Sequence, residues 1–159
     1  MVPEQPTKVV GRRTAAFILD AITWWVIVMV AFSALAKKDV PVTSSTNAHF
    51  TVNDQEWVVQ GGSYAVWVVI SLGSLIALAV VLEGITGWTP GKLVFGVRVV
   101  GRDGQAPGLG RAAVRLVGWL VDGLPWFIVW GLAGFVTSLA SKGNRRVGDM
   151  MAGTYVVHH

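Results

Sequence analysis

Residues 62–82 are Gly-Ser-Tyr-Ala-Val-Trp-Val-Val-Ile-Ser-Leu-Gly-Ser-Leu-Ile-Ala-Leu-Ala-Val-Val-Leu, and none of these side chains is charged. A helix needs about 20 predominantly apolar residues to cross the hydrocarbon core of a bilayer. Segment 62–82 has that length and no charge to keep it out of lipid. It therefore predicts a membrane-spanning helix, and it sets the class of the whole chain as an integral membrane protein.

A second apolar segment, residues 14–36, comes earlier in the chain and contains one charged residue, Asp20. The hydrophobic region of a cleaved signal peptide is shorter, about 7–15 residues. We therefore predict a first membrane span here rather than a leader. Basic residues flank the segment on both sides: Arg12, Arg13, Lys37 and Lys38.

A third apolar stretch lies within residues 112–141 and is interrupted by Asp122 and Pro125. Proline removes a helical hydrogen bond and kinks a helix. The segment is long enough to cross as a single helix, but Pro125 favours a broken form or a hairpin that turns back near it. Non-helical backbone at membrane depth has to be buried in protein. A hairpin would keep the basic C-terminal tail, residues 142–159, on the same side of the membrane as residues 83–111.

The distribution of basic residues predicts the orientation of the spans. Cytoplasmic loops carry an excess of Lys and Arg. The N-terminus and the loop 83–111 are rich in them and are expected in the cytoplasm, whereas the polar loop 37–61 is expected outside. The predicted fold is an all-α membrane protein, one domain over residues 1–159, with two full spans and a broken third.

Two short segments are strand-like. Residues 93–100 contain a β-branched run, and Asp103-Gly104 follows as a tight turn. Residues 154–157, Thr-Tyr-Val-Val, have the same character near the C-terminus. We predict that the two pair as a small cytoplasmic element in which Val99 and Val156 lie close enough for a cross-link.

Three motifs in order give the chain a resemblance to the RDD family of small bacterial membrane proteins. Arg13 and Asp20 correspond to its first arginine and first aspartate. Residues 89–96, Thr-Pro-Gly-Lys-Leu-Val-Phe-Gly, match its Thr-x-Gly-Lys-x-x-x-Gly stretch. Residues 145–157 match its closing stretch, where Asp149 is favoured as the second aspartate and Asp122 is the other candidate. The resemblance implies a bacterial plasma membrane location and suggests transport only in general terms.

The charged residues in or near the apolar segments are the candidate functional residues, because an ionisable group in a membrane is costly and often functional. Asp20 lies about 10 Å along the helix from Arg13, too far for direct pairing unless Arg13 extends along the helix. Its partner is expected from another segment. Glu83 either joins an acid relay with Asp20 and Asp122 or is solvated at a helix end. The full set is Arg13, Asp20, Glu83, Lys92, Arg115, Asp122 and Asp149, and the candidate partners of Asp20 are Lys92, Arg111 and Arg115.

Composition narrows the function. Charged residues make up 14% of the chain, against about 25% in soluble domains. Cysteine is absent, and no Ser/His/Asp arrangement or clustered metal ligands are recognisable, so we expect no enzyme, cofactor or metal. The net charge of +4 comes from residues that flank apolar segments, which favours anionic lipid headgroups over nucleic acid as the partner.

Two function classes remain. The first is a non-catalytic accessory or assembly subunit of a larger membrane complex, possibly an energy-transducing one, which associates with other membrane subunits or with itself. The second is an oligomeric transporter of a small ion that uses the intramembrane aspartates Asp20 and Asp122. In either class, the buried acids are carriers or structural locks that hold helices in place.

Overall fold

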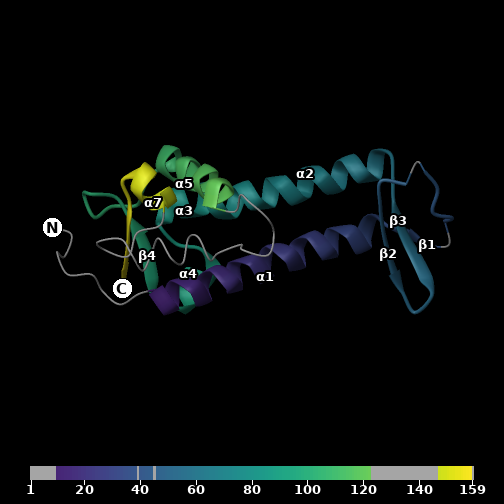
Figure 1. Cartoon of the computed structure of the whole chain (residues 1–159), viewed down its shortest axis with the longest axis horizontal. Helices are drawn as coiled ribbons and strands as arrows, with labels where there is room; N and C mark the ends of the chain where they lie inside the picture. The colour runs from purple at the N-terminus through teal and green to yellow at the C-terminus, as the bar shows by residue number, and fades with distance from the viewer. Residues whose placement is uncertain (1–9, 39, 45, 123–146, 159) are drawn as a thin grey trace. The chain divides into compact units, whose positions relative to one another are not determined.

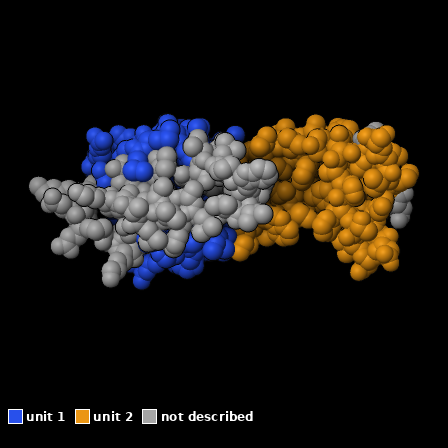
Figure 2. Space-filling view, in the orientation of Figure 1, with its two compact units in different colours: residues 1–21, 76–159 blue, residues 22–75 orange. Residues whose placement is uncertain are grey.

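The computed structural model describes residues 10–38, 40–44, 46–122 and 147–158. It divides into two compact units (Figure 2): unit 1 contains Met1–Ala21 and Ile76–His159, and unit 2 contains Ile22–Leu75. Most of the described secondary structure is helical (Figure 1). Two helices, Val10–Leu35 and Gly62–Thr86, are long and apolar enough to cross a membrane, and they cover the first two predicted spans except for Ala36.

In unit 2, two antiparallel helices are joined by tryptophan side chains. The helices are α1 (Val10–Leu35), of which residues 22–35 belong to this unit, and α2 (Gly62–Ile76). Trp24 Nε1 donates to the Ser71 carbonyl at 2.9 Å, and Trp67 Nε1 donates to the Val28 carbonyl at 3.1 Å. Each indole N–H therefore has a part-buried carbonyl partner on the facing helix, which fixes the helices against each other.

Large apolar side chains point outward from both helices. Few residues of either candidate span are buried inside the protein. An outward surface of this kind is expected of helices that lie in lipid, because lipid tails take the place of a protein core. The exposed set includes Ile22, Trp25, Val26 and Val30 on α1, and Val66, Val69, Ile70 and Leu72 on α2.

The predicted outer loop, residues 37–61, is not a simple loop. It forms an antiparallel sheet in the order β1–β3–β2, from β1 (Lys37–Lys38), β2 (Ala48–Val52) and β3 (Gln55–Val59). Asn53 and Asp54 connect β2 to β3 with φ values of 50° and 60°. Positive φ at both central residues is the tight hairpin turn that suits the right-handed twist of strands. The all-α prediction was wrong here because the hairpin signal in residues 48–59 was overlooked.

The second span continues beyond its predicted end at Leu82. After α2, residues Ala77–Leu82 form a π-helical segment, η1, and α3 (Glu83–Thr86) follows without a break. A π-helix spaces its hydrogen bonds one residue further apart than an α-helix, and such segments often occur at functional sites. Glu83 therefore lies inside the continued helix, at the point where the helical repeat has just been shifted.

In unit 1, the predicted strand pair is confirmed. β4 (Val97–Val100) pairs antiparallel with β5 (Tyr155–His158), with Val99 opposite Val156 (Figure 1). Val97 and Ala16 are fully buried, and Phe95 and Val156 pack against them. The pair therefore packs on the first turns of α1.

The described part of unit 1 also contains short or amphipathic helices: α4 (Pro90–Val94), α5 (Leu109–Asp122) and α7 (Val147–Ala152). The stretch predicted as a loop, residues 83–111, thus contains α3, α4, β4 and the start of α5. The third predicted segment overlaps α5. The choice between a broken span and a hairpin falls on residues 123–146, which lie outside the described residues.

Candidate functional site

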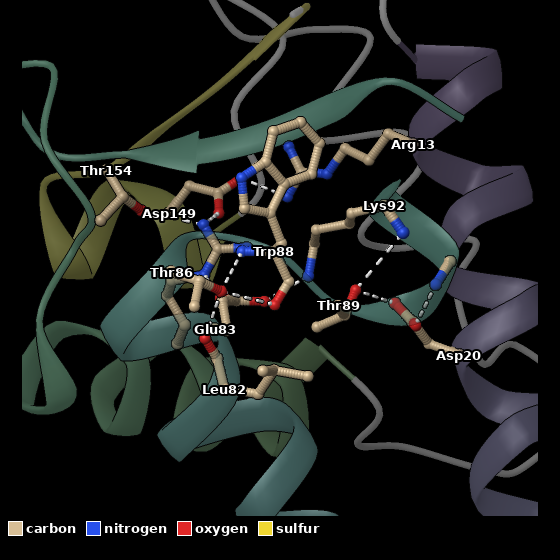
Figure 3. Close-up of polar contacts among 12 residues, drawn as sticks. Arg13, Asp20, Leu82, Glu83, Thr86, Trp88, Thr89, Lys92, Asp149 and Thr154 are labelled. Atoms are coloured by element: carbon tan, nitrogen blue, oxygen red, sulfur yellow. Dashed lines mark hydrogen bonds and ion pairs between the residues drawn. The ribbon is translucent and has the colours of Figure 1, made fainter. Parts of the chain in front are cut away.

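Arg13 and Asp149 form a buried ion pair between the start of α1 and α7 (Figure 3). Their side chains are 8% and 2% exposed. A charge at that depth is tolerated only when it is paired and hydrogen-bonded. The second oxygen of Asp149 lies 2.6 Å from Arg115 Nη1 of α5, so one carboxylate binds two guanidinium groups.

Glu83 extends the network from the second span. It forms an ion pair with Lys92 of α4, and its other oxygen lies 2.8 Å from Arg115 Nε. Glu83 is 5% exposed. The alternative that it is solvated was therefore wrong, because α4 and α5 cover it and supply its two cations.

Arg115 is the residue shared by both halves of the network. Besides Glu83 and Asp149, its Nη1 donates to Thr154 Oγ1 at 3.0 Å. Burial acts to lower the pKa of Arg115, but the carboxylates of Glu83 and Asp149 outweigh that effect and raise the pKa. The guanidinium is therefore a permanent positive charge between two acids, and it joins α5 to α3 and α7.

Asp20 lies beside this network and is held by α4. Its Oδ2 accepts from Thr89 Oγ1 at 2.5 Å, and its Oδ1 accepts from the Gly91 backbone N–H at 2.7 Å (Figure 3). The expected partner of Asp20 was a cation from Lys92, Arg111 or Arg115. Among the described residues, its hydrogen-bond partners are instead Thr89 and Gly91. Lys92 and Arg115 bind Glu83 and Asp149. Asp20 instead accepts hydrogen bonds from α4.

The sequence Thr89-Pro-Gly-Lys92 explains how α4 makes these contacts. Thr89 caps the helix, since its side chain accepts from the Lys92 N–H while its hydroxyl donates to Asp20. Pro90 occupies the first turn, where its missing N–H costs nothing. Lys92 then lies one turn on and reaches Glu83. Thr89 and Gly91 thus contact α1, and Lys92 contacts α3.

Gly91 allows α4 to approach α1 at backbone distance. A Cβ atom at this position would overlap the Ala16 carbonyl oxygen and would lie 2.9 Å from Asp20 Oδ1. Gly118 of α5 has a similar role, because a Cβ there would overlap the Cα of Gly148 in α7. Glycine at these two positions is therefore required by packing that brings the charged groups together.

The RDD family model matches residues 7–153 of the chain. This protein belongs to the RDD family. The match covers nearly the whole chain and includes both spans and the closing stretch around Asp149. Comparison with curated proteins and with solved structures gives no match.

In this RDD protein, the structure brings together most of the residues singled out by sequence. Arg13, Glu83, Lys92, Arg115 and Asp149 form one connected network, and Asp20 is adjacent to it through α4. Asp149 is the aspartate that binds Arg13, the residue that the resemblance matches to the first arginine of the family. The side chain of Asp122 is outside the described residues, and its assignment as the alternative family aspartate stays a prediction.

Sequence reasoning missed three residues of the RDD site: Thr89, Gly91 and Thr154. All three lie within the stretches matched to the family motifs, but none of them is charged, and charge was the criterion that singled out the other residues. A threonine ahead of Pro-Gly-Lys is a recognisable helix cap, which could have pointed to Thr89. Within the part of the chain described, no group of three or more metal-ligating side chains is positioned to hold an ion.

Proposed function

We propose that this RDD protein is a non-catalytic accessory or assembly subunit of a larger membrane complex. The observation that carries the proposal is that the charged groups of the site are engaged with one another. Asp149 binds Arg13 and Arg115, Glu83 binds Lys92 and Arg115, and Asp20 accepts two hydrogen bonds from α4.

A network of this kind is suited to holding helices rather than to moving ions. A carrier acid has to exchange its partner during each cycle, so at least one stable state leaves it available to solvent or substrate. The side chains of Glu83 and Asp149 are only 6% and 2% exposed. Breaking a buried pair by removing one partner is also costly, because an uncompensated charge remains. These features favour a structural lock.

The apolar faces of the spans are the surface that such a subunit would offer to other membrane subunits. Val69 is 69% exposed on α2, and a Cβ at the neighbouring Gly73 would meet nothing within 4 Å. Small residues on an open helix face permit close approach by another helix. The remaining exposed surface would contact lipid.

The amphipathic helix α5 supports a second contact, with the membrane surface. Its buried side includes Ala112 and Gly118, while Leu109, Val114 and Val117 are exposed. Arg111 is also exposed on this helix, and a helix whose outer side is apolar with an arginine can lie in the headgroup region, where anionic lipid attracts Arg and Lys. We propose a plasma-membrane location in a bacterium, with the N-terminus and α5 on the cytoplasmic side.

The alternative is an oligomeric transporter of a small ion that uses its intramembrane acids. The π-helical segment Ala77–Leu82 ahead of Glu83 favours it, since such segments frequently occur at functional sites. Asp20, within the first candidate span, would be the carrier. In this alternative, protonation or cation binding would have to displace Thr89 or Gly91 from the Asp20 carboxylate.

The deciding experiment is purification of the tagged protein from its native membrane in mild detergent, followed by mass spectrometry and stoichiometry of the companions. Larger membrane subunits in fixed ratio are the expected result, and Asp20→Asn should retain them if the fold survives. The proposal fails if the chain purifies only with itself and conducts an ion in proteoliposomes. Loss of that flux in Asp20→Asn, with Asp103→Asn as a matched surface control, would establish the transporter.

A further inference from the structure

The outer sheet of unit 2 has one edge that is protected and one that is open. The edge strand β1 consists of Lys37 and Lys38, and Lys38 lies over the Trp57 ring at 4.3 Å from its centroid. Lysine on an edge strand discourages pairing with another chain. The opposite edge strand, β2, is Ala-His-Phe-Thr-Val and has no Lys, Arg, Asp, Glu or Pro. Phe50 and Val52 on this strand are 51% and 44% exposed.

The hairpin register determines which backbone groups of β2 are unpaired. The turn at Asn53-Asp54 is closed by the pair Val52–Gln55, which places Val52 opposite its hydrogen-bonded partner. Hydrogen-bonded and non-hydrogen-bonded pairs alternate along an antiparallel ladder. The backbone groups of Phe50 and Ala48 are therefore hydrogen-bonded to β3, as those of Val52 are. The N–H and C=O groups of His49 and Thr51 point to the open edge.

From this edge we propose that two copies of the protein associate on the outer side of the membrane by antiparallel pairing of β2 with β2. The open groups of His49 in one copy would bond to those of Thr51 in the other, and the reverse. Phe50 then lies opposite Phe50 of the second copy, in a non-hydrogen-bonded pair where side chains are closest. Cross-strand aromatic pairs of this kind stabilise sheets.

Charge and symmetry select a second copy over another occupant. An edge without formal charge can face itself without repulsion, whereas it has nothing to attract a strongly charged peptide. The strands of the sheet run across the ends of the two helices of unit 2 rather than along them (Figure 1). A twofold axis parallel to the helices thus reverses the strand direction, giving antiparallel pairing, and keeps both copies in the same membrane orientation.

This proposal rests on the sheet edge alone and does not depend on the proposed accessory function. A dimer could itself be part of a larger complex or act alone. Mass spectrometry of the companion proteins tests the accessory function, whereas cross-linking between two copies of the chain tests the β2 contact. Each of the two proposals can therefore fail without the other.

Disulfide cross-linking in native membranes tests the pairing, because the chain has no cysteine of its own. Phe50→Cys should give a disulfide-linked dimer as the major species after mild oxidation, since paired Cα atoms in such positions lie within disulfide range. Asp54→Cys, at the exposed tip of the same hairpin, measures random collision. The expected yield for Phe50→Cys is at least five-fold that of the control.

A second variant separates edge pairing from mere proximity. In Phe50→Cys with Thr51→Pro, the outward N–H is lost while the β2–β3 ladder is retained, so cross-linking should fall to the level of the Asp54→Cys control. Thr51→Val should preserve it. Equal yields at Phe50→Cys and Asp54→Cys would overturn the proposal, as would a Phe50→Cys that neither cross-links nor reacts with a water-soluble maleimide, which would place the edge in lipid headgroups.

Discussion

Arg13 and Asp149 are 136 positions apart in the chain, yet they form a buried ion pair. The pair joins the first turn of α1 to α7, and Arg115 shares the same carboxylate at 2.6 Å. The two family motifs at opposite ends of the chain are therefore parts of one structural feature. Their charges neutralise one another where water is excluded, which explains why both ends contain an ionisable residue.

Removal of Asp149 should be the most damaging single change in the network. Asp149→Asn leaves Arg13 and Arg115 without their shared acid, and breaking a buried pair costs about 3–5 kcal/mol. The midpoint of thermal unfolding in detergent should fall sharply, or folded protein should be lost. Arg12, the exposed neighbour of Arg13, provides the control: Arg12→Gln should change the midpoint little.

The double variant Arg13→Ala with Asp149→Asn provides a stricter test. Its loss of stability should be smaller than the sum of the two single losses, because either single change already removes the ion pair that the two side chains share. Additive losses would contradict a direct interaction between the two side chains.

Gly91→Ala should destabilise the protein although alanine is a better helix former than glycine. The added Cβ would overlap the Ala16 carbonyl oxygen, which is backbone and cannot rotate away. Overpacking typically costs about 1–3 kcal/mol. The matched change is Gly110→Ala in α5, where a Cβ meets nothing within 4 Å; it should leave stability unchanged or slightly raised. Thermal unfolding of the two variants side by side measures the difference.

Glu83→Gln should cost more stability than Lys92→Gln. Glu83 binds two cations, so its neutralisation weakens both contacts, whereas removal of Lys92 leaves Glu83 with Arg115 at 2.8 Å. Unfolding midpoints of the two variants and of the double variant measure the order. A greater loss of stability in Lys92→Gln would show that Arg115 alone does not neutralise the Glu83 carboxylate.

Single cysteines should report the predicted orientation. Asp54→Cys, in the outer hairpin, is expected to react with a membrane-impermeant maleimide in intact cells, while Gln105→Cys should react only after the cells are opened. Both positions are exposed, so the difference would come from the membrane. The reverse pattern would place the N-terminus outside and contradict the positive-inside interpretation.

The spans and the β4–β5 pair were predictable because their signals are local. A charge-free run as long as residues 62–82 has few alternatives, and β-branched runs identified residues 93–100 and 154–157 as strand-like. The outer hairpin had an equally local signal in Asn53-Asp54 between two apolar runs. It was missed because neither residue is glycine, the usual marker of such a turn.

The partners of the charges were not predictable, because spacing along one helix says nothing about which other segment faces it. Seven residues of separation disfavoured Arg13 as the direct partner of Asp20, but the choice of Thr89 and Gly91 depends on the crossing of α4 over α1. The burial of Glu83 likewise depends on the cover supplied by α4 and α5.

By itself, the sequence indicated a membrane protein, identified the two candidate spans and showed which charges would need explaining, because length, apolarity and net charge are sums over neighbouring residues. Only the tertiary structure decided that Arg13 binds Asp149, that Lys92 and Arg115 share Glu83, and that Asp20 holds α4. Those pairings depend on distances between segments far apart in the chain. Coulomb and hydrogen-bond energies fall steeply with such distances.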